Sequence, residues 1–462
     1  MSKTPVPNLS KLSELKSRIL FLLLALVIYR MGAFISVPGV NVDALSEILR
    51  QQDSSGGVSA MINMFSGGAF ERMSIFMLGV MPYITASIII QILSVVYPPL
   101  EQLKKEGQAG RRKMTQYTRY LTLLLAAVQG TAYAIALQNG SMGVASSVIM
   151  ISGPLFVILA VVTWMTGTMF LMWLGEQISE RGIGNGISMI IFASIVSGVP
   201  GGIAYLFEAA RNDQMQIFTV ILIVAIVLSV IWLVVYVERA QRRVAINYAR
   251  KQQGRQSSSM AQATHLPLKL NMAGVIPAIF GSALLAFIYT ISSFLQNIDI
   301  TPESSTALKI LQSIGHLGAS SFGQGQLAQM VLFSFMIIFF CFFYTALQFN
   351  SKETAENLKR SGAFVPGIRP GIHTSQYLDK VLSRITFWGA LYITGICLLP
   401  EILSNTLGLQ FYFGGTSVLI AVVVVMDLIA QVQAHLMSQQ YDSLMKKTNI
   451  SSALASQRSP HI

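Results

Sequence analysis

Few residues in this sequence could perform covalent chemistry or hold a metal ion or a phosphate group. The histidines are scattered through the chain, at positions 265, 316, 373, 435 and 461. No HExxH pair and no GxxxxGK(S/T) loop is present. The run RGIGNG at 181–186 is rich in glycine, but its glycines alternate and no strand is predicted before it, so it predicts a sharp turn at the start of a helix. The sequence therefore predicts no enzyme, no catalytic residue, no cofactor and no bound metal.

Charged residues inside apolar segments are the next candidates, because a charge in the membrane interior is costly and usually functional. Only Arg30 and Asp427 lie well inside such segments, and Glu401 lies at the end of one. Arg30 could extend to the membrane surface or form a pair, and Asp427 could pair within a helix bundle. A proton-coupled carrier would contain more buried carboxylates than this, so structural roles are favoured for both residues.

The overall composition is that of a membrane protein with many spans. Hydrophobic residues make up 53% of the 462 residues and charged residues only 11%, whereas soluble domains carry about 25% charged residues. So little polar surface cannot cover a soluble core of this size, and the apolar content excludes a disordered chain. The two cysteines, Cys341 and Cys397, lie in apolar runs, which indicates small buried side chains and not a disulfide framework.

Apolar runs of about twenty residues predict an all-α protein with ten transmembrane helices. Each run is bounded by charged residues, Pro or Gly, and none alternates as a strand of a membrane barrel would. The predicted spans are approximately 20–38, 73–96, 117–137, 153–174, 187–206, 217–237, 274–294, 328–349, 383–403 and 412–435. No small-residue cleavage site follows the first run, so it is predicted to be an uncleaved span and not a signal peptide.

The lysines and arginines predict the orientation of these spans. Of the 32 basic residues, 25 lie at the two termini and in alternate loops, and the opposite loops contain 4. Because basic loops stay in the cytoplasm, both termini are predicted to be cytoplasmic. The longest basic loops are 238–273 and 350–382. Their charge suits either a large acidic or nucleic-acid-bearing partner or anionic lipid headgroups.

Residues 58–72 form an apolar segment that is too short to cross the membrane and is broken by Gly67 and Gly68. The segment precedes the second span on the side opposite the cytoplasm. Irregular backbone at membrane depth must be covered by protein or line a cavity, so one interpretation is a re-entrant element that closes a pore. The alternative is an interfacial helix on the membrane surface. The residues alone do not separate these two interpretations.

Two helix faces carry branched aliphatic residues four positions apart, Val80 with Ile84 and Ile187 with Ile191. Residues at this spacing share one face of a helix. A ring of such side chains can close a pore by excluding water. Buried helices commonly contain such pairs, however, so ordinary packing is the stronger interpretation from the residues alone.

Several segments together resemble the SecY family, whose members form the central subunit of the bacterial protein-conducting channel. The matching segments are MFSGGAFERMSIFMLGVMPYITASIIIQIL (64–93), EGQAGRRKMTQYTRY (106–120), TGTMFLMWLGEQISERGIGNGISMIIFA (166–193), VERAQRRVAINYAR (237–250), THLPLKLNMAGVIPAIF (264–280), ENLKRSGAFVPGIRPG (356–371) and FYFGGTSVLIAVVVVMDLIAQVQ (411–433). They occur in order, span nearly the whole chain and fit the ten-span pattern. The resemblance implies two inverted, pseudo-symmetric halves, 1–210 and 211–462, hinged between spans five and six.

The resemblance also implies the positions of a pore ring, a plug and a lateral gate. The implied ring consists of Val80, Ile84, Ile187, Ile191, Ile279 and Ile420, with Val80 smaller than the isoleucine expected there. The implied plug is the segment 58–72, with Met61, Met64, Phe65, Gly67, Gly68 and Phe70. The implied gate lies between spans two and three on one side and spans seven and eight on the other. Thr85 and Gln129 occupy gate-facing positions, and Phe287 stands where some relatives have an asparagine.

The function implied by the resemblance is passage of unfolded secretory polypeptides across the bacterial inner membrane and sideways release of transmembrane segments into lipid. The implied partners are the small membrane subunits SecE and SecG, the SecA ATPase motor, the ribosome with its nascent chain, signal peptides, unfolded preproteins and membrane lipids. The implied partner-binding residues on the basic loops are Arg242, Arg243, Arg250 and Arg369.

Two other classes of protein are weighed against the channel. A secondary transporter of small solutes would have buried coupling carboxylates and a polar site beside broken helices, for which one Asp and one Arg give thin support. An intramembrane enzyme would need a paired nucleophile and base or a metal motif, and the sequence contains no recognisable one. Loss of general secretion on depletion, as opposed to loss of uptake of one solute, distinguishes the channel from the transporter.

Overall fold

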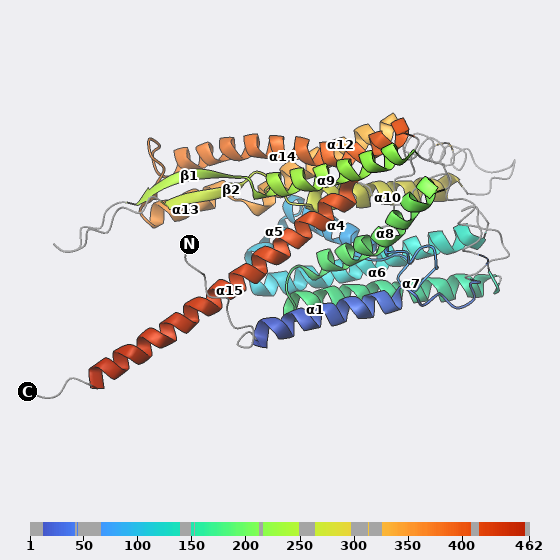
Figure 1. The fold of residues 1–462 in the computed structure, drawn as a ribbon, viewed down its shortest axis with the longest axis horizontal. Helices are drawn as coiled ribbons and strands as arrows, with labels where there is room; N and C mark the ends of the chain where they lie inside the picture. Colours follow the sequence, from blue (N-terminus) through green and yellow to red (C-terminus); the bar gives the residue numbers. More distant parts are fainter. Residues whose placement is uncertain are drawn as a thin grey trace, which may run out of the picture.

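A computed structural model of the chain describes residues 13–41, 44, 66–138, 149–151, 153–211, 216–248, 264–296, 313, 326–407 and 415–457. Over these residues the chain forms a bundle of long helices with a small sheet at one end (Figure 1). The helices that correspond in order to the ten predicted spans are α1 (Ser13–Gly32), α4 (Met81–Val96), α6 (Gln108–Gln138), α7 (Pro154–Arg181), α8 (Gly186–Arg211), α9 (Ile217–Arg239), α10 (Ile276–Gln296), α12 (Leu327–Gln348), α14 (Ile372–Leu407) and α15 (Gly415–Gln457).

Seven of the described helices are long and apolar enough to cross a membrane singly, and an eighth span results if α4 and α5 (Pro98–Lys105) are counted as one bent pair. The axes of α4 and α5 differ by 98°. Tyr97 has extended dihedral angles directly before Pro98, as the steric restriction on a residue before proline requires. The remaining two predicted spans correspond to α10, whose apolar part is shorter, and to α1, which carries Glu14, Lys16, Arg18 and Arg30.

The second predicted span starts later than its apolar run. Residues 73–80 form turns, and helical structure begins only at Met81. Gly79 has a φ of +56° and Pro82 stands in the first turn of α4, which together explain a helix start at this point. Ser74 also forms an antiparallel bridge with Ser36. The prediction of a helix over 73–80 was therefore wrong, because hydropathy does not distinguish buried turns from buried helix.

A central hydrophobic cluster joins the helices of the bundle. It contains buried residues of α1, α4, α7, α8, α10, α12, α14 and α15. Helix α10 packs against α4, α6, α12 and α14, and α15 packs against α8, α9 and α14. Helix α9 has only Ile223 and Val234 buried, which fits a helix that is apolar on all faces and turned toward lipid.

The two long basic loops meet in a three-stranded antiparallel sheet with the order β2-β1-β3. Strand β1 (Gln241–Tyr248) pairs with β2 (Thr264–Lys269) from the same loop and with β3 (Ala363–Phe364) from the other. Val244 and Ile246 of β1 are buried, as expected for alternate residues of a strand with one covered face. The segment 350–382, predicted as a loop, also contains α13 (Ser351–Arg360) and the first turns of α14.

The sheet and α13 lie at the end of the bundle where α1 begins and beyond which α15 projects (Figure 1). This arrangement brings both predicted cytoplasmic loops to one end of the molecule, as the distribution of basic residues predicts. A separate hydrophobic cluster of β1, β2 and α14 residues, which includes Val244, Leu268 and Leu382, anchors the sheet on the bundle.

Candidate pore ring, plug and lateral gate

The six aliphatic residues of the predicted ring belong to, or pack against, one hydrophobic cluster of the structure. Val80 directly precedes α4 and Ile84 lies in its first turn, whereas Ile187 and Ile191 belong to α8, Ile279 to α10 and Ile420 to α15. Five of them are buried members of the central hydrophobic cluster, and Ile187 is partly buried and packs against that cluster. The i, i+4 pairs that could have been ordinary packing thus share one apolar region with residues distant in sequence.

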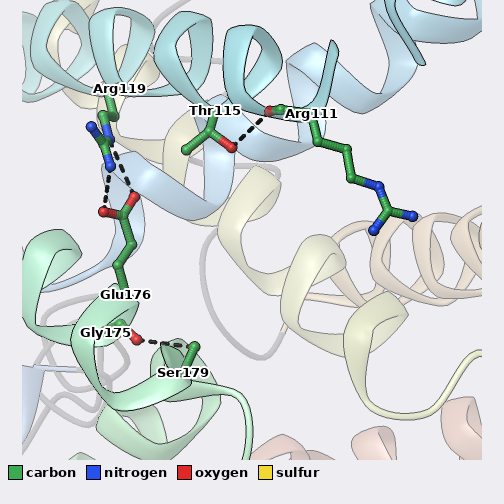
Figure 2. A network of polar contacts seen from close by, with 6 residues as sticks. All are labelled: Arg111, Thr115, Arg119, Gly175, Glu176 and Ser179. Carbon is green, nitrogen blue, oxygen red and sulfur yellow. Dashed lines mark hydrogen bonds and ion pairs between the residues drawn. The ribbon is translucent and has the colours of Figure 1, made fainter. Parts of the chain in front are cut away.

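A close approach of α7 and α8 positions Ile187 and Ile191. Helix α7 ends at Arg181 and α8 begins at Gly186, which confirms the sharp turn predicted for 181–186. The main-chain N–H of Gly186 donates a hydrogen bond to the Ser179 hydroxyl oxygen at 2.8 Å. The Ser179 hydroxyl in turn donates to the carbonyl oxygen of Gly175 at 3.0 Å (Figure 2). A Cβ atom at Gly186 would lie only 1.8 Å from that carbonyl oxygen, so the first turn of α8 requires glycine here.

Gly186→Ala is expected to lower the free energy of unfolding by about 3 kcal/mol or more, because the added methyl group meets rigid backbone. The measurement is thermal or denaturant unfolding of the purified protein in detergent. Gly198→Ala is the matched control on the same helix, since a Cβ atom there has no neighbour within 4 Å. This control is expected to be neutral or stabilising by up to about 1 kcal/mol. Equal stability of the two variants would contradict the close contact between α7 and α8.

The described part of the predicted plug, residues 66–72, lies inside the protein. Ser66, Gly67, Ala69 and Phe70 are buried, and the segment forms turns. Gly67 and Gly68 have φ values of +67° and +82°, which glycine adopts without strain. Burial of these residues favours a re-entrant element over a helix on the membrane surface. Met61, Met64 and Phe65, the other predicted plug residues, lie outside the described residues.

The two sides of the predicted lateral gate are in contact in the structure. Helix α10 packs against both α4 and α6, which carry Thr85 and Gln129. Both of these polar residues are buried. The Thr85 hydroxyl donates a hydrogen bond to the Met81 carbonyl oxygen at 3.1 Å, so it is satisfied within its own helix. Phe287 is partly buried on α10, and an apolar side chain at this position adds no polar contact to the gate.

An ion pair joins α6, a helix of the predicted gate, to α7 near the predicted cytoplasmic ends of both helices. Nη2 of Arg119 lies 2.6 Å from Oε2 of Glu176, and Nε lies 3.2 Å from Oε1 (Figure 2). Such a two-point contact fixes direction as well as distance. Because both side chains are partly exposed, the pair stabilises the fold by about 1 kcal/mol at most. Its effect is to align α6 with α7.

The predicted partner-binding arginines lie on the sheet end of the molecule. Arg242 and Arg243 are exposed on β1, and Arg369 is exposed between β3 and α14. The main chain around Arg369 is fixed by a hydrogen bond from the Thr374 hydroxyl to the Arg369 carbonyl oxygen at 2.9 Å. Since β1 and β3 are paired, the two loops that carry these arginines are joined in one sheet. Arg250 lies outside the described residues.

Sequence reasoning missed a polar cluster between α1, α8 and residues 66–67. It consists of Tyr29, Arg30, Ser66, Gly67 and Ser194, which are linked by hydrogen bonds. Arg30 gave a signal in the sequence as a charge within an apolar run, and Gly67 as a break in the segment 58–72, but nothing in the sequence joined the two. Asp427, the other intramembrane charge, lies on an exposed face of α15, so the structure does not place it in the interior. Across the described ranges, no group of three or more His, Cys, Asp or Glu side chains could hold a metal ion.

The fold resembles solved channel structures. A structure described as that of a protein conducting channel has a TM-score of 0.60 and 17% identity, with 94% of this chain and 97% of that chain covered. Sec61 in a canine ribosome-channel complex from the endoplasmic reticulum has a TM-score of 0.59 and 17% identity over the same shares of the two chains. The fold therefore defines the class as a multi-pass membrane protein with the architecture of a protein-conducting channel.

Sequence comparison identifies the family within this class. The SecY family model matches residues 74–429. The protein translocase subunit SecY of Vibrio cholerae is 53% identical over 444 residues, which cover 96% of each chain. The chain belongs to the SecY family.

Proposed function

We propose that this chain is the central subunit of a protein-conducting channel in the bacterial inner membrane, with both termini in the cytoplasm. It passes unfolded secretory polypeptides across the membrane and releases transmembrane segments sideways into lipid. The observation that carries this proposal is 53% identity to a translocase subunit across 96% of both chains. The termini and loops on the predicted cytoplasmic side contain 25 basic residues, and the opposite loops contain 4. This difference supports the orientation.

The predicted ring supplies a seal that a moving chain can pass. An unfolded polypeptide needs an aqueous path, because each backbone polar group left unsatisfied in hydrocarbon costs several kcal/mol. Aliphatic side chains such as Ile84, Ile191 and Ile279 offer a passing chain no hydrogen bond to hold it. When no chain is present they exclude water and therefore ions. The segment 58–72 acts as a plug on the side opposite the cytoplasm.

Sorting at the lateral gate needs no catalysis. If α10 separates from α4 and α6, a segment in the pore meets lipid and distributes according to its own hydrophobicity. A leucine or phenylalanine favours the membrane by about 0.3–0.6 kcal/mol, whereas a central lysine or aspartate disfavours it by about 2.5–3.5 kcal/mol. This difference separates membrane segments from secreted ones. The halves 1–210 and 211–462 move as two bodies about the connection between α8 and α9.

Partners supply the energy for transport, because this sequence has no nucleotide-binding loop of the GxxxxGK(S/T) type. Other partners complete the channel assembly. SecE and SecG are the small membrane subunits, and signal peptides, preproteins and lipid are what the channel handles. The SecA motor and the translating ribosome dock on the basic surface of Arg242, Arg243, Arg250 and Arg369. Positive charge on ordered loops suits both an acidic protein surface and ribosomal RNA. The chain itself has no enzymatic role.

A disulfide crosslink tests whether a polypeptide passes through the ring. Cys341 and Cys397 are free and buried, so both are replaced with alanine, which leaves no unpaired hydroxyl group in the core. A single cysteine then replaces Ile191, and a precursor with one cysteine is stalled midway through transport. We expect a disulfide bond between the channel and the precursor at this position.

The control places the single cysteine at Leu228, which is 61% exposed on α9 and is predicted to face lipid. We expect no crosslink there. If the stalled precursor also forms no crosslink from Ile84, Ile191 or Ile279 in a folded channel, the path does not run through the ring. The assignments of the ring, the plug and the gate would then all be wrong.

A further inference from the structure

Two neighbouring residues of α1 hold the backbone of residues 66–70, here called the plug turn. The Nη1 group of Arg30 donates a hydrogen bond to the Gly67 carbonyl oxygen at 2.8 Å. The Tyr29 hydroxyl donates to the Ser66 carbonyl oxygen at 3.1 Å. Both acceptors are main-chain atoms, so α1 holds the course of the backbone itself and does not depend on the side chains of the plug turn.

Tyr29 is itself fixed from two sides. Its hydroxyl oxygen is hydrogen-bonded to the Ser194 hydroxyl of α8. Either hydroxyl group can donate in this contact, because each has a single hydrogen atom and a second acceptor, the Ser66 carbonyl oxygen for Tyr29 and the Ile190 carbonyl oxygen, at 2.9 Å, for Ser194. The Tyr29 ring stacks on Phe76, with ring centroids 6.0 Å apart and an interplanar angle of 16°. The polar chain therefore runs from α8 through α1 to the plug turn.

The plug turn fits this polar site only because residue 67 is glycine. A Cβ atom at Gly67 would lie 3.0 Å from the Cα atom of Ser194 and 3.2 Å from Nη1 of Arg30. The φ of +67° at Gly67 is also one that other residues rarely adopt. Glycine thus allows the carbonyl group to approach the guanidinium group while α8 packs against the turn.

The position of Arg30 in the membrane strengthens its hydrogen bond to Gly67 while the channel is closed. It also lets that hydrogen bond break at little cost when the channel opens. Arg30 is partly buried in an apolar helix, and its guanidinium carbon lies 5.5 Å from the centroid of the Phe34 ring. A hydrogen bond from a charged donor is strongest where water is scarce. When the plug turn moves away, water of the open pore can hydrate the guanidinium group in place of the carbonyl oxygen.

We propose that Arg30 and Tyr29 form a latch that holds the plug turn against α1 and α8 and so keeps the channel closed. Arg30 is a positioning residue in this proposal, because it acts on the plug and not on the transported chain. The latch and the aliphatic ring both stabilise the closed channel. The strength of the latch determines how easily the plug is displaced. This inference rests on the proposed function, because it assigns a closing role to the segment that contains the turn.

The test compares ion leak and precursor transport of the channel reconstituted with its membrane partner subunits. Arg30→Ala is expected to raise the leak of the resting channel roughly ten- to hundredfold, the effect of losing one hydrogen bond from a charged donor. Tyr29→Phe keeps the stacked ring, removes only the hydroxyl group and is expected to raise the leak about two- to tenfold. Arg30→Lys keeps a charged donor and is expected to restore most of the seal, which a purely structural role of the arginine side chain would not predict.

Arg18→Ala is the matched control. It removes another arginine of α1, whose guanidinium group pairs with Glu14 of the same helix at 3.0 Å and not with the plug turn, and its leak is expected to equal that of the wild type. Wild-type leak in both Arg30→Ala and Tyr29→Phe would overturn the latch, as would an equal increase in Arg18→Ala. If Arg30→Ala yields no assembled channel, Tyr29→Phe alone decides. Precursor transport by the unaltered channel tests the proposed function separately, so that failure of the latch is distinguishable from failure of the channel assignment.

Discussion

Shortening Ile191 to alanine is expected to raise the ion conductance of the resting channel at least about tenfold. Ile191 is 1% exposed and belongs to the hydrophobic cluster that also contains four other predicted ring residues. Truncation of a buried isoleucine to alanine costs about 2–5 kcal/mol, from lost contacts and from the cavity left behind. In an open pore these contacts are already broken, so much of this cost falls on the closed state. A change of about 1.4 kcal/mol in that balance is already a tenfold change in open population.

Single-channel or ensemble conductance in planar bilayers measures this effect. Ile190→Ala is the control, because Ile190 is also 1% exposed in the same cluster but points about 100° away around α8. Both variants lose the same atoms from the core, so both are expected to lose similar stability. Only Ile191→Ala is expected to leak. Equal conductance of the two variants would show that general loosening of the core, and not a ring, controls closure.

The helical part of the fold follows from local sequence, and the sheet does not. Apolar runs of span length between charged loops were sufficient to place all ten helices in order. The turns at 73–80 were missed because they are as apolar as the helix that follows. The pairing of β1 with β3 joins Tyr248 to Ala363, across more than one hundred residues. No local periodicity in either loop signals such a distant partner, so the sequence predicted two long basic loops but not the sheet that joins them.

The candidate site likewise has features that are visible in the local sequence and features that only the tertiary fold reveals. The pairs Val80 with Ile84 and Ile187 with Ile191 are visible at i, i+4 spacing, but that they share one hydrophobic cluster with Ile279 and Ile420 depends on the tertiary fold. The contacts of the plug turn were hidden for a different reason. The acceptors for Tyr29 and Arg30 are main-chain carbonyl oxygens, which every residue possesses and no sequence pattern marks. Arg30 was visible as an intramembrane charge, yet its partner was not.

Arg369→Glu is expected to lower motor-driven translocation at least about tenfold while the fold remains intact. Arg369 is exposed, and its carbonyl group is fixed by Thr374, so the side chain is presented from an ordered segment and little freedom is lost on binding. If the motor buries Arg369 in a hydrogen-bonded charge pair, loss of that pair costs about 2–5 kcal/mol. Reversal of the charge adds repulsion to that loss. The surrounding Pro and Gly residues are unchanged, so the shape of the loop should persist.

The assay is ATP-dependent import of a purified precursor into proteoliposomes, with thermal unfolding of the variant as the check on folding. Lys352→Glu on α13 is the matched control: Lys352 is also exposed, and the substitution changes the net charge by the same amount. If only total positive charge attracts the motor, Arg369→Glu and Lys352→Glu will lower transport equally. Added salt will then also lower the transport of both variants to the same extent. If Arg369 makes a specific contact, only its reversal will abolish transport. Normal translocation by Arg369→Glu would remove this residue from the docking site and leave Arg242 and Arg243 on β1 as the described arginines to test next.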